Sequence, residues 1–230
     1  MNSIKLSKRL QAIANCVIGK RIVDVGCDHG KVAYYLIANN IAKYVICTDI
    51  SAPSVSKAEK LLQENKIEKS KYDIRCGDGL ETVSSADRLD TTIIAGMGGY
   101  ETIKILQNAD FLTETLVLQP QRNWIDVKKY VLSIQYNIVY DRIIFDDGKY
   151  YNIIICRHDC NNSDAMNEFQ LHYGKDNYVG DTQDFVSYLA YEEEKLQKIL
   201  SKVAKDDRQL VETMLNLNRQ AKQKLGDINE

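Results

Sequence analysis

Residues 22–36, with the sequence IVDVGCDHGKVAYYL, place acids and glycines where an apolar run ends. Asp24 and Gly26 close the run, and Asp28 and Gly30 follow. A dinucleotide-binding turn has the pattern G-x-G-x-x-G, because a pyrophosphate lies against the next helix. Asp28 stands where that pattern needs a glycine, and its carboxylate would repel a pyrophosphate. The turn therefore favours a ligand that carries an ammonium or sulfonium group.

Two more acids end apolar runs. Asp49 ends residues 44–50, and Asp78 ends residues 72–78 within RCGDGL. Singly, a helix cap explains either acid as well as a ligand does. Together with Asp24 they suit S-adenosylmethionine, because Asp49 can accept both ribose hydroxyls, Asp78 can hold the adenine amine and Asp24 can orient the amino-acid portion. Dinucleotide binding remains the alternative. The predicted cofactor residues are Asp24, Gly26, Cys27, Asp28, His29, Gly30, Asp49, Ile50, Asp78, Gly79 and Gly96.

The fourth apolar run ends in AGMGGYETI, where three glycines occur in four positions, Gly96 to Gly99. Such a turn allows close backbone approach to a ligand. Many methyltransferases that act on exocyclic amino groups instead place an Asn/Asp-Pro-Pro-aromatic turn here. The predicted substrate-positioning residues are Gly96, Met97, Gly98 and Gln119, and we expect no general base among them.

The segment LQPQRNW follows the next apolar run. Gln119 and Asn123 could contact base edges, Arg122 a phosphate and Trp124 a base, although Trp124 equally suits a core. Further along, Cys156, His158 and Cys160 in CRHDC form only half of a zinc motif. We therefore expect no metal site.

Apolar runs and amphipathic segments alternate from residue 21 to about 157. The runs 21–26, 44–50, 72–78, 91–96 and 115–120 predict five parallel strands, and Asp146 to Lys149 predict a closing hairpin turn. Helices are expected over 52–66 and over the N-terminal segment LSKRLQAIANCVI. This is an α/β fold with a seven-stranded sheet, which we assign to residues 1–160.

Residues 161–230 are polar and contain no further strand signal. Apolar residues recur at helical spacing, which predicts two antiparallel helices over 182–204 and 207–226. We expect this helical extension to fold on itself or on the sheet.

The composition gives no general sign of a nucleic-acid partner, because 30 basic and 32 acidic residues leave a net charge of -2. RNA contacts would have to come from local groups. The candidates are Lys5, Lys8, Arg9, Lys20, Arg21, Arg122, Asn123, Lys128 and Lys129. Six scattered cysteines give no disulfide framework, and we find no signal peptide or long apolar span. We expect a cytoplasmic monomer without a membrane association.

The motifs LSKRLQAIANCV, DVGCDHGKVAYYL, TDIS, GDGL, IIAGMGG and LVLQPQRN resemble the bacterial tRNA (adenine-22-N1)-methyltransferase family. Lys31 and Val32 depart from the small or aromatic residues more usual there. The resemblance implies a Rossmann-like methyltransferase sheet with a C-terminal helical, coiled-coil-like extension. It implies that S-adenosylmethionine methylates N1 of an adenosine in tRNA.

Adenine N1 has a free lone pair, so its methylation requires no general base, and the base would be turned out of the RNA beside Gly96 to Gly99. Asp28 is expected to stabilise the cationic product. Two alternatives remain open. One is a methyltransferase that acts on another RNA position or on a small molecule, and the other is a non-catalytic RNA-binding module.

Overall fold

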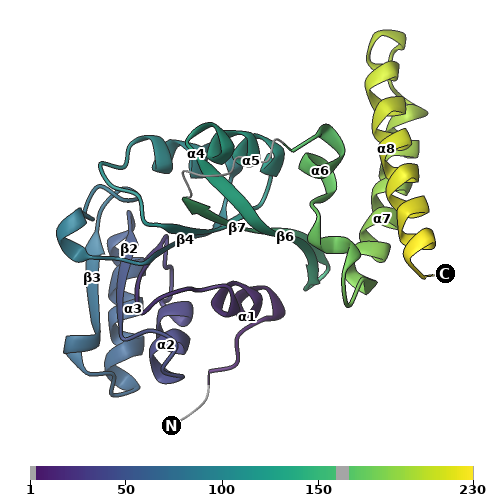
Figure 1. Cartoon of the computed structure of the whole chain (residues 1–230). Helices are drawn as coiled ribbons and strands as arrows, with labels where there is room; N and C mark the ends of the chain where they lie inside the picture. The colour runs from purple at the N-terminus through teal and green to yellow at the C-terminus, as the bar shows by residue number, and fades with distance from the viewer. Residues whose placement is uncertain (1–3, 159–165, 230) are drawn as a thin grey trace.

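A computed structural model of the chain describes residues 4–158 and 166–229, without the side chains of 205–207, 228 and 229. One seven-stranded sheet has the order β3-β2-β1-β4-β5-β7-β6 (Figure 1). Its strands are β1 (Arg21–Val25), β2 (Tyr44–Asp49), β3 (Tyr72–Cys76), β4 (Thr91–Met97), β5 (Thr115–Pro120), β6 (Tyr136–Asp146) and β7 (Lys149–His158).

The first five strands are parallel, and β7 pairs antiparallel with both β5 and β6. The predicted parallel sheet with a closing hairpin is therefore confirmed. Since β1 lies between β2 and β4, the carboxyl ends of these three strands meet at one edge of the sheet. β3 ends at Cys76, so Asp78 lies in the following turn and not at the end of the strand.

Helices cover both faces of the sheet (Figure 1). One layer consists of α1 (Lys8–Asn15), α2 (Lys31–Ala38) and α3 (Ala52–Glu64), and the other contains α4 (Gly99–Gln107) and α5 (Trp124–Ser133). Ile13 of α1 is fully buried in the first layer, and Val127 of α5 is fully buried in the second. The predicted N-terminal helix packs as expected but ends at Asn15. Ser51 caps α3 as predicted, through a hydrogen bond from the Ser54 N–H.

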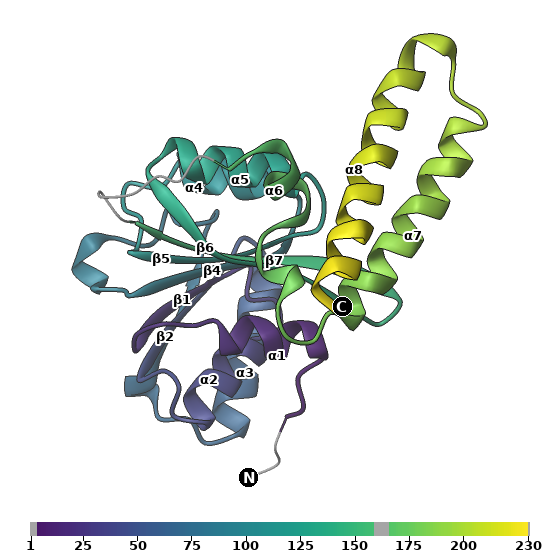
Figure 2. The ribbon, with the colours of Figure 1, turned by 45° about the vertical axis from the view of Figure 1, so that its right-hand side comes forward.

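The C-terminal extension contains α6 (Glu168–Tyr173), a 3-10 turn η3 (Asp176–Tyr178), α7 (Gln183–Leu200) and α8 (Lys205–Asn229). Helices α7 and α8 form an antiparallel hairpin that projects from the sheet domain, with the C-terminus back at its base (Figure 2). Leu196, Val211 and Leu215 are buried in its seam. Two antiparallel helices are thus confirmed, although α7 ends at Leu200 and not at residue 204.

The base of the extension is fixed to the outer strand, β6. The side chains of Asp176, Asn177 and Asp184 accept hydrogen bonds of 2.8, 2.7 and 3.0 Å from backbone N–H groups of β6. An edge strand otherwise leaves such groups free to pair with another chain. The extension therefore covers the open edge of the sheet. The predicted boundary at residue 160 falls outside the described residues. Within the described ranges, no helix has the length and apolar character needed to cross a membrane.

Candidate functional site

The turn after β1 is held against the end of β2. The N–H groups of Gly26 and Cys27 donate hydrogen bonds of 2.8 and 3.0 Å to the Thr48 carbonyl. Gly26 has a φ of 67°, and a Cβ there would lie 2.2 Å from Cε of Met97. The positive φ favours glycine at this position, whereas the close contact is with the flexible end of the Met97 side chain, which can move aside.

The carboxylate of Asp49 closes this turn from the neighbouring strand. It accepts hydrogen bonds from the N–H of Asp28 at 3.1 Å and from the N–H of Ser51 at 2.8 Å. Each oxygen keeps lone pairs for a ligand. Asp49 thus lies where the sequence placed it, at the end of β2 beside the glycine turn.

Asp24 is buried, with 5% of its surface exposed, and lies beside Cys47 and Ile93 in the sheet. Burial, and secondarily the charge of Asp49, raise the pKa of Asp24 to about 7. A buried carboxyl of this kind is stabilised in its charged form by a cation. The site therefore holds an acid suited to an ammonium group.

A cavity of about 420 Å³ opens at the ends of β1, β2 and β4 and at the turn after β3. Of the predicted cofactor residues it is lined by Gly26, Asp49, Ile50, Asp78, Gly79 and Gly96, and also by Met97. Ile50 is 72% exposed, which leaves an apolar side chain free to cover a ring. The structure therefore brings these predicted residues together around one space.

Five lining residues were missed by the sequence analysis, namely Val25 and Ala95 of the strands and Glu101, Lys104 and Ile105 of α4. The Nζ atom of Lys104 lies 3.9 Å from the carboxylate of Asp78. Lys104 and Ile105 follow Glu101 by three and four positions in the helix after the Gly96–Gly99 turn, so the three residues share a helix face. That spacing was the signal that could have found them.

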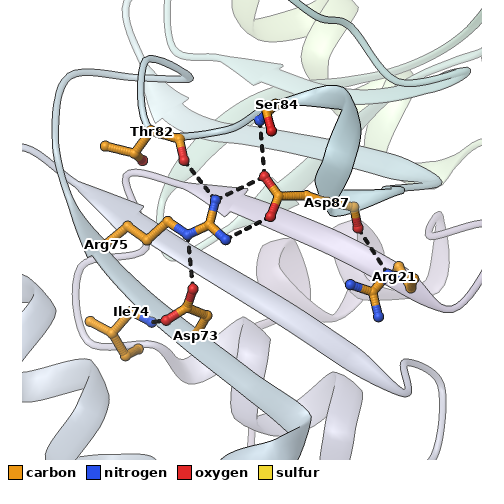
Figure 3. Close-up of polar contacts among 7 residues, drawn as sticks. All are labelled: Arg21, Asp73, Ile74, Arg75, Thr82, Ser84 and Asp87. Carbon is orange, nitrogen blue, oxygen red and sulfur yellow. Dashed lines mark hydrogen bonds and ion pairs between the residues drawn. The ribbon is translucent and has the colours of Figure 1, made fainter.

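An ion-pair network fixes the loop that carries Asp78 (Figure 3). The guanidinium of Arg75 donates to both carboxylate oxygens of Asp87, at 2.6 and 2.9 Å, and to the Thr82 carbonyl at 2.6 Å. Asp73 accepts a further bond of 2.9 Å from Arg75. The pKa of the Asp87 carboxyl is lowered, and the hydrogen bond from Arg75 is the largest cause. The loop after β3 is thereby tied back to its own strand.

The other predicted cofactor residues do not line this cavity, namely Asp24, Cys27, Asp28, His29 and Gly30. Cys27 is buried, whereas Asp28 and His29 are exposed. The Nε2 atom of His29 lies 3.6 Å from a carboxylate oxygen of Asp28. Asp28 has a φ of 47° and contacts Asp49 through its N–H. This differs from the expectation that the Asp28 carboxylate faces a cationic ligand. Gly30 also serves packing, because a Cβ there would lie 2.8 Å from Cβ of Ala58.

The three glycines at the end of β4 and after it differ in backbone conformation and in the space around them. Gly96 has a φ of 81°, whereas Gly98 has an extended backbone with open space where a Cβ would lie. At Gly99 a Cβ would lie 2.5 Å from the Arg122 carbonyl oxygen. Close backbone approach therefore concerns Gly99, and Gly96 needs glycine for its conformation.

Gln119 lies at the end of β5 and is fully buried. Its Oε1 accepts a hydrogen bond of 2.5 Å from Arg9 of α1, and its Nε2 has no partner among the described residues. The neighbouring Gln121 donates from Nε2 to the Gly96 carbonyl at 2.8 Å. Arg9 lies 5.2 Å from the centre of the Tyr151 ring. A polar cluster thus adjoins the Gly96 turn on the side away from β2.

One predicted RNA contact is wrong. Lys128 is fully buried, and its Nζ lies 2.6 Å from the Asp141 carboxylate. It cannot reach an RNA phosphate from there. Burial lowers the pKa of Lys128 and raises that of Asp141, so desolvation outweighs the attraction within the pair. Removal of one partner would leave the other buried without a counter-charge.

The other basic candidates are distributed unevenly. Lys8 pairs with Asp184 at 2.6 Å, and Arg9 belongs to the polar cluster. Lys20 and Arg21 lie at the opposite edge of the sheet, where β1 begins, and contact backbone carbonyls there. The remaining candidates are exposed, namely Lys5, Arg122, Asn123 and Lys129.

Two minor expectations concern Trp124 and a metal. Trp124 is partly buried and packs on the apolar clusters of the sheet and of the extension, which supports its core interpretation. Cys160 of the half zinc motif lies outside the described residues. In residues 4–158 and 166–229, no group of three or more His, Cys, Asp or Glu side chains could hold a metal ion.

The sheet order, the glycine turn and the cavity together define a class of protein. Residues 6–154 match the family model described as a methyltransferase domain, and the chain belongs to that family. The resemblance to tRNA (adenine-22-N1)-methyltransferases is confirmed by a curated Bacillus subtilis relative, "tRNA (adenine(22)-N(1))-methyltransferase". It is 32% identical over 159 residues, which span 67% of this chain and 66% of the relative.

Solved structures extend the likeness to the whole fold. A protein of the NADB-Rossmann superfamily from Streptococcus agalactiae is 28% identical, with a TM-score of 0.83, and the match covers 100% of this chain and 99% of that one. M. capricolum TrmK, solved with S-adenosyl-homocysteine, is 24% identical with a TM-score of 0.85, covering 96% of this chain and 99% of that one. The Rossmann-like methyltransferase fold with a helical extension is therefore confirmed.

Proposed function

We propose that this protein transfers a methyl group from S-adenosylmethionine to N1 of an adenosine in tRNA. The observation that carries the proposal is the cavity at the strand ends, which joins Asp49 and Asp78 to the Gly96 turn. The name of the Bacillus subtilis relative supports tRNA as the substrate and nucleotide 22 as the position. The M. capricolum structure, solved with the cofactor product, supports the cofactor.

The residues present fit this cofactor. Asp24 is a buried acid suited to the ammonium group, and Asp49 has free lone pairs for ribose hydroxyls. Ile50, Asp78 and Gly79 line the part of the cavity that suits an adenine ring. When bound, S-adenosylmethionine supplies an electrophilic methyl group on a sulfonium. The chain's part is to bind this group and to align the nucleophile with it, which can supply much of the rate enhancement.

Adenine N1 attacks with a free lone pair and releases no proton. The protein therefore needs no general base, and it must not place a donor against N1. Gln119 is fully buried, so it supports the substrate side of the site through its hydrogen bond with Arg9 and not by contact with the base. Since N1 lies on the Watson–Crick edge, the base must leave its stack to reach the Gly96 turn.

Exposed cations supply the remaining contacts to RNA. Arg122 lies in the loop before α5, Lys129 lies in the middle of α5, and Lys5 precedes α1. Contacts to phosphates would make binding weaken as salt rises. A cytoplasmic location and a monomeric state remain predictions of the sequence.

The test is to incubate the protein with unmodified total tRNA and labelled S-adenosylmethionine, and then to map the labelled nucleotide. We expect N1-methyladenosine at position 22. Label at another position, or no label together with no S-adenosylhomocysteine binding by calorimetry, would reject the proposal.

A variant pair sharpens the assignment of the cofactor cavity. Asp49→Asn should weaken S-adenosylhomocysteine binding at least about tenfold, because a hydrogen bond to a charged group contributes about 1.5–3 kcal/mol. Glu64→Gln removes the same charge from an exposed site on α3 and should bind normally. Equal affinities in both variants would place the cofactor elsewhere.

A further inference from the structure

A second cavity, of about 540 Å³, lies between the sheet domain and the helical hairpin. One wall consists of the loop that begins α5 and of the β6–β7 turn, and the other consists of α7 and α8. Figure 2 shows the hairpin standing beside these elements. We call this cavity the hairpin groove and define it by Arg122, Trp124, Lys149, Tyr150, Tyr191 and Lys195.

The inner end of the hairpin groove reaches the proposed methyl-transfer site. Gln121 and Tyr151 also line the groove. Gln121 donates a hydrogen bond of 2.8 Å to the Gly96 carbonyl, and Tyr151 lies against the Arg9 guanidinium. A polymer bound in the groove would therefore run up to the turn beside the cofactor cavity.

The groove presents a supported aromatic ring. Tyr191 is 50% exposed, and its ring lies 5.3 Å from the ring of Tyr150. Tyr150 in turn contacts the ring of the buried Tyr188 at 5.3 Å, and the Tyr188 hydroxyl donates to Glu192 at 2.7 Å. Such an exposed ring on a packed base suits stacking with a nucleobase, since every base has a π-face.

The exposed charge that lines the groove is positive. Arg122, Lys149 and Lys195 are all exposed, and they come from three different elements. Glu192 is the one acid among the lining residues, and its carboxylate already accepts hydrogen bonds from Tyr173, Tyr188 and Asn218. In a chain with a net charge of -2, this arrangement favours a polyanion with aromatic groups.

We propose that the hairpin groove binds unpaired nucleotides of the RNA substrate, adjacent to the target base. A base stacks on Tyr191, and the phosphates lie near Arg122, Lys149 and Lys195. This inference rests on the proposed function and deepens it, because it gives the helical extension a part in holding RNA. A second copy of the chain is the competing occupant, since Ile199 and Leu210 add exposed apolar surface to the groove.

The experiment measures the Kd for an unmodified tRNA transcript with adenosine at position 22, in the presence of S-adenosylhomocysteine. Tyr191→Ala should weaken tRNA binding about five- to hundredfold, the range found when stacked aromatic residues are removed. Tyr191→Phe should bind normally, and Tyr191→Leu, which keeps apolar bulk without the ring, should be weak. Val186→Ala, at an exposed position of α7 outside the groove, is the matched control.

A salt titration provides a second readout. Lys195→Ala should lower the slope of log Kd against log salt by about one, as expected for one lost phosphate contact. Affinity for S-adenosylhomocysteine should stay unchanged in every groove variant, because none of these residues lines the cofactor cavity.

Three outcomes separate the possibilities. The groove proposal is wrong if folded Tyr191→Ala and Tyr191→Leu bind tRNA as tightly as the wild type does. If the wild type also methylates tRNA, the proposed function stands. If sedimentation shows a dimer that Tyr191→Ala dissociates without loss of tRNA affinity, a second copy occupies the groove. If the wild type neither binds S-adenosylhomocysteine nor methylates tRNA, the proposed function itself fails.

Discussion

The guanidinium of Arg9 donates a hydrogen bond of 2.5 Å to the side-chain oxygen of Gln119, across 110 positions of the chain. Arg9 is itself held in place, since its N–H donates to the Asp146 carboxylate at 3.0 Å. This contact links α1 to the end of β5, next to the Gly96 turn. The N-terminal helix therefore contributes to the substrate side of the site as well as to the core.

Arg9→Ala should lower the methylation rate about ten- to a hundredfold. The variant removes a charged hydrogen bond, of about 1.5–3 kcal/mol, that orients the buried Gln119 amide. Steady-state kinetics with tRNA measure the effect, and calorimetry with S-adenosylhomocysteine should show normal affinity. Arg9→Lys keeps the charge without the planar fork and should be intermediate. Full activity of folded Arg9→Ala would show that Arg9 does not position the substrate.

The raised pKa of Asp24 predicts how stability depends on pH. Its folded pKa of about 7 lies above its ordinary value of 3.8, so the group favours folding in its protonated form. This contribution is present below about pH 4 and is lost as the pH rises to about 7. Asp24→Asn should therefore match the wild type at low pH and become more stable than it near pH 8, by on the order of 4 kcal/mol. Urea unfolding across pH 4–8 measures the difference, and a constant difference would contradict the assignment.

The same carboxyl predicts how cofactor affinity depends on pH. Only ionised Asp24 attracts an ammonium group, so affinity for S-adenosylhomocysteine should rise as the pH increases through about 7. In Asp24→Asn the affinity should be weaker and should not change over this range. Calorimetry from pH 5.5 to 8.5 tests this expectation. An identical pH profile in the variant would assign the ammonium group to another residue.

Much of the cofactor cavity could be predicted from the sequence because its signals are local. Asp24 and Asp49 are marked by their position at the ends of apolar runs, and parallel strands bring such ends to one edge. The structure places both acids there. Asp78 was predicted from the same signal, although it lies two residues beyond the end of β3.

The substrate side was less predictable because its contacts join distant segments. Gln119 was found by its place near the end of a strand, but its partner Arg9 lies in α1 and looked like a phosphate contact. Lys128 was misassigned for a similar reason, since its burial depends on Asp141 in β6. A local pattern did exist, because the buried Val127, Lys128 and Val131 share one face of α5.

The two neighbouring glycines Gly98 and Gly99 should respond differently to a methyl group. A Cβ at Gly99 would lie 2.5 Å from the Arg122 carbonyl oxygen, and backbone atoms cannot move aside cheaply. Gly99→Ala should lower the free energy of unfolding by about 1–3 kcal/mol. Gly98→Ala meets no atom within 4 Å and should stay within about 0.5 kcal/mol. Urea denaturation compares the two, and equal stability would rule out the close contact at Gly99.

The buried pair of Lys128 and Asp141 should be essential for stability and not for direct RNA contact. Lys128→Met leaves the Asp141 carboxylate buried without its cation, which should cost about 3–5 kcal/mol of the free energy of unfolding. Lys129→Met alters the exposed neighbour and should change stability by less than about 0.5 kcal/mol. Combining Lys128→Met with Asp141→Leu should recover part of the loss, because no unpaired charge remains. Urea unfolding gives the stabilities, and tRNA binding is measured on the folded fraction. If Lys128→Met were as stable as the wild type but bound tRNA more weakly, Lys128 would be an RNA contact after all.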